Sequence, residues 1–147
     1  MLTDIVLRSA LRSDWHHIAA LLEQCSLPTS DTYELIEDFQ VAIYEDGIVG
    51  CAAAEYHGSH VLIRSVAVEP AYRDNGIATR LVEILLMRAR GTEAHDAYIF
   101  STVAPAYFAR WGFSLVATEE VPQEVKLLPA VQRAARTSAL CMRCELG

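Results

Sequence analysis

The chain has little positive charge, and this shortage argues against two large classes of partner. Its 12 Lys and Arg residues are outnumbered by 19 Asp and Glu residues, which gives a formal net charge of −7. Nucleic acids and anionic membrane surfaces are bound mainly by basic surfaces. We therefore expect no nucleic-acid partner and no membrane partner. A small phosphate-bearing ligand is not excluded, because it needs only a local basic cluster.

Long apolar runs are also missing. No run approaches the ~20 residues that a membrane-spanning helix needs. The first residues, Met-Leu-Thr-Asp-Ile-Val-Leu-Arg, do not place a basic segment before an apolar core, so we expect no signal peptide and a cytoplasmic protein. Repeats and low-complexity stretches are absent. The 147 residues therefore predict one globular domain, residues 1–147.

Cysteine is sparse, which argues against a structural metal site. Of the four cysteines, only Cys141 and Cys144 form a C-x-x-C pair. A structural zinc site takes four ligands and usually a second such pair. The segment also reads as a strand, in which residues three apart point to opposite faces. We expect no metal and treat the cysteines as buried or surface thiols.

Hydrophobic periodicity predicts an alternation of strands and helices along the whole chain. Hairpin-connected strands come first and helix-connected strands follow, which predicts an α/β (α+β) fold with one mixed, mainly antiparallel sheet of six or seven strands and helices on both faces. An Asp-Gly pair predicts the first hairpin turn, and Gly91 is placed for a left-handed helix end. Strands are expected at 4–9, 39–44, 48–56, 61–68, 97–102, 113–117 and 138–145, and helices at about 15–25, 31–38, 76–90 and 105–111. Residues 119–131 are expected to form a loop with a turn or two of helix.

One stretch runs from an apolar strand, residues 66–68, through a polar loop into a long apolar helix. The loop carries the pattern R-x-x-G-x-A from Arg73 to Ala78. Gly76 lacks a Cβ, so the backbone there can approach a ligand closely, and Arg73 brings donors suited to phosphate. The helix start adds unpaired N–H groups and roughly +0.5 of an elementary charge. The pattern predicts a pyrophosphate site; the alternative is an ordinary strand, turn and helix with a solvated Arg73.

The same loop resembles the acetyl-CoA-binding motif (Q/R-x-x-G-x-G/A) of the GNAT family of N-acetyltransferases, with Ala78 in the place of the last glycine. Residues 102–113 resemble the second signature of that family, and the order of elements agrees over nearly the whole chain. The resemblance implies acetyl-CoA as co-substrate, with the loop amides on its pyrophosphate and the preceding strand on its pantetheine arm. The cofactor contacts that it implies are Val66, Ala67, Val68, Arg73, Asp74, Asn75, Gly76, Ile77, Ala78, Thr79, Thr102 and Phe108.

Within that family, the chain resembles the acetyltransferase domain of bacterial N-acetylglutamate synthase and the small acetyltransferases associated with arsenic-resistance operons. The resemblance implies a small amino-acid-like amine as acceptor, held by Arg136 and Ser138. The basic pair that follows the first helix in the synthase is absent here, where residues 28–31 read Pro-Thr-Ser-Asp. Arg64 is a candidate replacement for that carboxylate clamp. A structural alternative is that Arg64 pairs with Glu55 on the neighbouring strand.

The reaction expected of such a site is attack of a neutral amine on the thioester carbonyl of acetyl-CoA, directly within a ternary complex. A backbone N–H near Val66 or Ala67 is the candidate stabiliser of the carbonyl oxygen. Glu55 acting through water is the candidate base, and His57 and His60 are alternatives. The family places a Tyr acid at the position of Phe108, so Tyr107 is the candidate acid here.

Two other functions remain open at the level of sequence. The chain could be a non-catalytic acetyl-CoA-binding sensor or regulatory module, or it could acetylate a peptide or protein. Turnover with an amino-acid panel separates the enzyme from the sensor. The resemblance also implies a possible homodimer, through the last strands.

Overall fold

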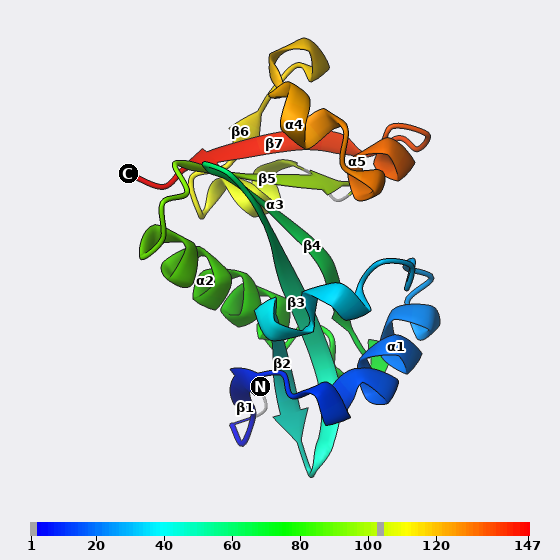
Figure 1. The fold of residues 1–147 in the computed structure, drawn as a ribbon. Helices are drawn as coiled ribbons and strands as arrows, with labels where there is room; N and C mark the ends of the chain where they lie inside the picture. The colour runs from blue at the N-terminus through cyan, green and yellow to red at the C-terminus, as the bar shows by residue number, and fades with distance from the viewer. Residues whose placement is uncertain (1–2, 103–104) are drawn as a thin grey trace. The chain divides into compact units, whose positions relative to one another are not determined.

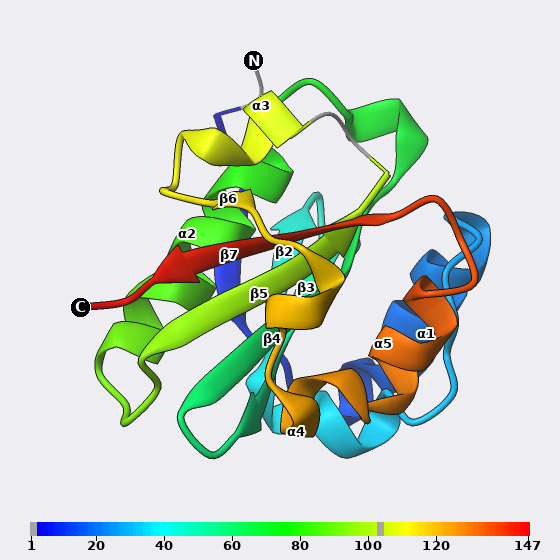
Figure 2. The ribbon, with the colours of Figure 1, turned by 90° about the horizontal axis from the view of Figure 1, so that it is seen from above.

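The computed structural model describes residues 3–102 and 105–147 and shows one open, mixed sheet of seven strands (Figure 1). The strands lie in the order β1-β2-β3-β4-β5-β7-β6, and Figure 2 shows β7 between β5 and β6. This confirms the predicted fold class. The strands are β1 (Val6–Ser9), β2 (Phe39–Tyr44), β3 (Gly47–His57), β4 (His60–Val68), β5 (Asp96–Ser101), β6 (Ser114–Leu115) and β7 (Leu140–Glu145).

The helices follow the predicted pattern with local differences. A 3-10 helix replaces the predicted second helix, and Pro129 begins α5 at its first turn, a position where the missing N–H of proline has no cost. Gly91 has no left-handed φ, so that prediction was wrong. The α-helices are α1 (Trp15–Gln24), α2 (Ile77–Arg90), α3 (Pro105–Ala109), α4 (Gln123–Lys126) and α5 (Pro129–Ala134), and 3-10 helices lie at Arg12–Asp14, Tyr33–Asp38, Pro70–Tyr72 and Thr118–Glu120.

The first hairpin turn also differs in detail from the prediction. Glu45 and Asp46 are its two central residues, with φ of 49° and 65°, and Gly47 already belongs to β3. Two successive left-handed residues give the turn the twist that a two-residue hairpin requires. The hairpin is therefore as predicted, but the Asp-Gly pair is shifted by one residue within it.

The chain divides into two compact units, Met1–Glu55 with Ile63–Met87 and Tyr56–Leu62 with Arg88–Gly147. In the first unit, α1 and the 3-10 helix Tyr33–Asp38 share a core with one face of β2 and β3 that includes Cys51. Gly50 points to the other face, where an added Cβ would lie 2.8 Å from Ile77 Cγ2 of α2. Helices therefore cover both faces of these strands, and Gly50 permits the close approach of α2.

In the second unit, β5 and β7 pair in antiparallel register and carry a core on each face. Cys141 lies in the cluster formed with α4 and α5. Cys144 lies on the opposite face, where its Sγ is 3.2 Å from the carbonyl oxygen of Trp111. The prediction that the two thiols point to opposite faces is confirmed. Burial raises the pKa of Cys141 to about 11 and also raises that of Cys144, so both thiols stay protonated at neutral pH.

A buried carboxylate, Asp96, organises one end of the second unit. His60 Nδ1 lies 2.6 Å from its Oδ1, and Arg143 Nε and the Tyr98 hydroxyl donate to its Oδ2 at 2.9 and 3.1 Å. Burial alone would raise the pKa of Asp96, but the hydrogen bonds from His60 and Arg143 outweigh it and hold that pKa below its ordinary value. Asp96 is therefore ionised and stabilising in the folded chain at neutral pH.

We expect Asp96→Asn to lower the free energy of unfolding by about 2 kcal/mol at pH 7, because charged hydrogen bonds are lost. A carboxyl with a lowered folded-state pKa stabilises the fold above its unfolded pKa of about 3.9, and that contribution disappears as the pH falls through the folded pKa. The difference between wild type and variant should therefore shrink below about pH 4. Urea unfolding across pH measures this, with Asp46→Asn in the exposed hairpin turn as the control. A difference that does not change with pH would contradict the account.

Candidate functional site

The predicted pyrophosphate loop is built by hydrogen bonds within the first unit. After β4, the 3-10 helix Pro70–Tyr72 leads into the loop 73–76 and then into α2. Asn75 Nδ2 donates to the carbonyl oxygens of Tyr72 and Arg73 at 3.0 and 3.1 Å. Asp74 and Gly76 have left-handed φ of 66° and 74°. Alternation into the left-handed region turns successive backbone N–H groups toward one side, which is the usual anion-binding arrangement.

Two observations in this loop fit a phosphate group. A Cβ built on Gly76 meets no atom within 4 Å, so the space above that backbone is open. Arg73 is exposed, while its Nε donates to the carbonyl oxygen of Val68 at 3.0 Å and one terminal nitrogen lies 3.6 Å from Cys25 Sγ. The guanidinium is thus anchored at its base and presents its outer edge to solvent. The remaining residues of the motif, Ile77, Ala78 and Thr79, form the first turn of α2.

The strand before the loop, β4, contains one residue with an unusual backbone conformation. Ser65 has φ of 56° in the middle of β4, a conformation that a non-glycine residue adopts only when its surroundings hold it. Cys51 Sγ donates to the carbonyl oxygen of Ser65 at 3.5 Å. Ser65 lies directly before Val66, Ala67 and Val68, the three residues predicted to face the pantetheine arm. A local irregularity of this kind can leave backbone groups outside the regular hydrogen-bond ladder.

Arg64 is held by two carboxylates in the first unit. Its Nη1 donates to Glu55 Oε1 at 2.7 Å, and its Nη2 donates to Asp31 Oδ1 at 3.2 Å. The side chains of Arg64, Glu55 and Asp31 are 9%, 13% and 30% exposed. The predicted pairing with Glu55 is confirmed. Asp31 was missed, because it lies 33 residues from Arg64 and reads locally as a helix cap.

The second aromatic signature lies in the second unit. Tyr107 is half-buried and Phe108 is buried, with ring centroids 5.0 Å apart. Arg110 stacks over Tyr107 at 4.7 Å, and Gly112 ends the segment with φ of 88°. Thr102 is exposed just before this helix. The segment is a compact aromatic cluster, and the roles of Tyr107, Phe108 and Thr102 stay predictions.

The predicted acceptor residues lie on the turn between α5 and β7. Arg136 and Ser138 are exposed. The backbone around them is fixed by Thr137, whose hydroxyl accepts from the N–H of Ala139 at 3.1 Å and donates to the carbonyl oxygen of Ala134 at 2.7 Å. The side chains of Arg136 and Ser138 are therefore presented on an ordered turn. Of the alternative bases, His60 is already bonded to Asp96, and His57 is half-buried at the end of β3.

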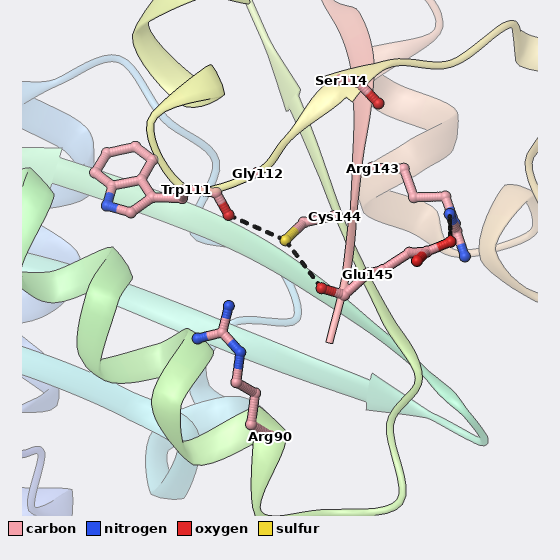
Figure 3. A pocket seen from close by; sticks show the side chains of 7 residues that line it. All are labelled: Arg90, Trp111, Gly112, Ser114, Arg143, Cys144 and Glu145. Carbon is pink, nitrogen blue, oxygen red and sulfur yellow. Dashed lines mark hydrogen bonds and ion pairs between the residues drawn. The ribbon is translucent and has the colours of Figure 1, made fainter. Parts of the chain in front are cut away.

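A polar hollow of about 440 Å³ lies elsewhere in the second unit and contains none of the predicted site residues (Figure 3). Figure 3 shows Arg90 and Arg143 on opposite sides of Cys144. Arg143 is engaged by Asp96 and by Glu145, at 2.9 and 3.4 Å. The hollow is lined by Arg90, Trp111, Gly112, Ser114, Arg143, Cys144 and Glu145. Of its two arginines, Arg143 is thus part of the buried Asp96 network, and the hollow contains no residue of the predicted site.

Two further observations concern the residues that the structure describes. Among them, no group of three or more His, Cys, Asp or Glu side chains is arranged to hold a metal ion. None of the helices in these ranges combines the length and the apolar character needed to cross a membrane.

The family model and the sequence relatives that match this chain are all acetyltransferases. The family model for the acetyltransferase (GNAT) domain matches residues 36–115, more than half of the chain. The chain is 35% identical over 102 residues to the amino-acid acetyltransferase of Mycobacterium tuberculosis, covering 63% of this chain and 55% of that protein. It is 28% identical over 128 residues to the amino-acid acetyltransferase of Neisseria meningitidis serogroup A, covering 81% of this chain and 29% of the relative. The chain thus spans about half, or less, of the length of these relatives.

Solved structures of similar fold also include an acetyltransferase of this kind. N-acetylglutamate synthase from Neisseria gonorrhoeae, complexed with coenzyme A and N-acetyl-glutamate, superimposes with a TM-score of 0.82 at 26% identity, covering 100% of this chain and 36% of that one. A Mycobacterium tuberculosis protein in complex with CoA and NLQ superimposes with a TM-score of 0.80 at 26% identity, covering 95% of this chain and 98% of that one. Both similar proteins were therefore crystallised with coenzyme A.

Proposed function

We propose, from the premise that this chain belongs to the acetyltransferase (GNAT) domain family, that it transfers an acetyl group from acetyl-CoA to the amine of a small amino-acid-like substrate. The observation that carries the proposal is the loop 73–76. It combines a left-handed Gly76 under open space, an anchored but exposed Arg73 and the first turn of α2. These are the features that hold a pyrophosphate.

Different residues of the chain carry out different steps of the proposed reaction. Bound acetyl-CoA supplies the thioester carbonyl that the amine attacks, and holding the two reactants together supplies much of the rate. A backbone N–H at Val66 or Ala67 stabilises the negative charge that develops on the carbonyl oxygen. Glu55 accepts the ammonium proton through a water molecule. Tyr107 donates a proton to the departing thiolate.

The class of acceptor is inferred from relatives and from one exposed turn. The relatives are named amino-acid acetyltransferases, and the gonococcal neighbour was solved with N-acetyl-glutamate. Arg136 and Ser138 lie on an ordered turn, where a guanidinium can bind the α-carboxylate of an amino acid in bidentate fashion. A small molecule with an amine beside a carboxylate fits this arrangement.

The test of the proposal is the release of CoA thiol when the protein is mixed with acetyl-CoA and each member of an amino-acid panel. We expect release above the rate of background hydrolysis with at least one amino acid, together with the matching N-acetyl product. Saturable acetyl-CoA binding without turnover on any amine would instead identify a sensor. Turnover only with peptide amines would show that the acceptor is a peptide and not a small molecule.

We expect Arg136→Ala to raise KM for the amino acid by roughly 10-fold to 100-fold, because one charged bidentate contact is lost. The affinity for acetyl-CoA should not change. Steady-state kinetics for both substrates measure this. Arg12→Ala removes an arginine that is 73% exposed and paired only at 3.5 Å with Glu37, and serves as the control. A parallel loss of acetyl-CoA affinity in Arg136→Ala would show that the acceptor site is assigned to the wrong residues.

A further inference from the structure

In the ion-paired cluster of Arg64, Glu55 and Asp31, one guanidinium is shared by two carboxylates. Arg64 is bonded at 2.7 Å to Glu55 and at 3.2 Å to Asp31. All three are at least two-thirds buried, where the field of a charge is less screened than in water.

The sequence made Arg64 a candidate to bind a carboxylate of the substrate. The contacts that Arg64 makes within the chain argue against that role. Both terminal nitrogens of the guanidinium already donate to carboxylates of the chain itself. A substrate carboxylate that approached Arg64 would have to displace Asp31 or lie beside the carboxylates of Asp31 and Glu55. Like charges brought together in a partly buried site oppose binding.

Asp31 is held in its place by structure beyond the ion pair. It lies in the segment between α1 and the 3-10 helix Tyr33–Asp38 and has a left-handed φ of 56°. The next residue, Thr32, is fully buried, and its hydroxyl donates to the carbonyl oxygen of Thr29 at 2.6 Å. This backbone conformation is uncommon outside glycine, although aspartate adopts it more readily than most residues. The carboxylate of Asp31 is therefore positioned beside Arg64 by the fold.

We propose that Asp31 is a specificity-determining residue: together with Glu55 it occupies the Arg64 guanidinium and disfavours acceptor amines that carry a second carboxylate. The inference rests on the proposed function and narrows its substrate class. The preferred acceptor has one carboxylate, bound elsewhere, and an uncharged side chain in place of the second. Glutamine and glutamate are nearly isosteric and differ in this charge, so they form the probe pair.

The experiment compares kcat/KM for glutamine and glutamate in wild type, Asp31→Asn and Glu34→Gln. Asn keeps the shape of Asp31 and its acceptor oxygen but removes the charge. Glu34 is exposed in the neighbouring 3-10 helix, so its substitution changes the net charge of the chain equally. We expect wild type to prefer glutamine about tenfold or more, Asp31→Asn to reduce that preference about tenfold, and Glu34→Gln to leave it unchanged.

Several outcomes would overturn the proposal. A wild-type preference for glutamate overturns it without any variant, so the test does not depend on how well Asp31→Asn folds. An unchanged ratio in a folded Asp31→Asn protein, or an equal change in Glu34→Gln, also overturns it. Failure of wild type to acetylate any amine is a different result, because it rejects the proposed function itself. Product formation with a glutamate preference rejects only the role of Asp31.

Discussion

Replacing Gly76 by valine is expected to lower the affinity for acetyl-CoA by about 100-fold or more, which corresponds to about 2.7 kcal/mol. Gly76 has φ of 74°, a region that a β-branched residue strongly avoids. The backbone would shift, and the valine side chain would project into the open space above the loop, where the pyrophosphate is proposed to lie. Isothermal titration of acetyl-CoA into the wild-type and variant proteins measures the effect.

Gly58 provides a matched control for this variant. It also has a left-handed φ, of 56°, and no atom lies within 4 Å of a Cβ built on it. Gly58→Val therefore introduces the same kind of backbone strain in the turn between β3 and β4, which is not part of the loop 73–76. We expect it to reduce stability but to leave acetyl-CoA affinity within about twofold of wild type. Equal losses of affinity in the two variants, or unchanged affinity in Gly76→Val, would reject the pyrophosphate assignment.

Arg64→Leu is expected to lower the free energy of unfolding by about 2–3 kcal/mol, because it removes the shared partner of two partly buried carboxylates. Urea unfolding monitored by circular dichroism measures it. The size of the loss reflects the uncompensated charges of Glu55 and Asp31 more than the net worth of the ion pairs.

Two further variants separate this explanation from a general loss of packing. Adding Glu55→Gln and Asp31→Asn to Arg64→Leu removes the uncompensated charges and should restore most of the lost stability. Arg12→Leu removes an arginine from an exposed ion pair, with side chains 73% and 79% exposed, and should have no measurable effect. If the triple variant is as unstable as Arg64→Leu alone, the loss comes from packing and not from charge.

The parts of the fold that the sequence predicted well are those set by local pattern. The helix α2 carries a regular apolar stripe, and the strand, loop and helix around Gly76 form one continuous motif of about a dozen residues. The hairpin of β2 and β3 was predicted for the same reason. Its turn was shifted by one residue, because Glu45 and Asp46 adopt left-handed conformations that their residue types do not demand.

The parts that were missed depend on contacts between distant residues. Asp31 reads locally as a cap, and only the folded chain brings it to Arg64. The buried Asp96 network joins residues from β4, β5 and β7, and no local pattern indicates it. The strand β6 is only Ser114–Leu115, shorter than predicted, because it pairs with β7 over just those two residues. Ser65 gave no sign of its left-handed backbone, since serine commonly occupies regular strands.

The sequence predicted the acetyl-CoA-binding residues more directly than the residues that bind the acceptor amine. The donor motif is contiguous, so Arg73 to Thr79 could be identified from residue order alone. The acceptor residues Arg136 and Ser138 rested on resemblance, and they lie in a turn whose order comes from the Thr137 side chain. The pairing of Glu55 with Arg64 was one of two alternatives that the sequence offered, because a buried arginine requires a partner. The second partner of Arg64, Asp31, could be identified only from the structure.

The most direct test of the central claim is a single-turnover experiment with isotopically labelled acetyl-CoA, followed by mass spectrometry of the amine. The account predicts that wild type moves the labelled acetyl group onto the nitrogen of an amino acid, and that Gly76→Val does so at a greatly reduced rate while Gly58→Val does not differ from wild type. Saturable binding of acetyl-CoA with no labelled amine product, across a panel that includes glutamine and glutamate, would contradict it.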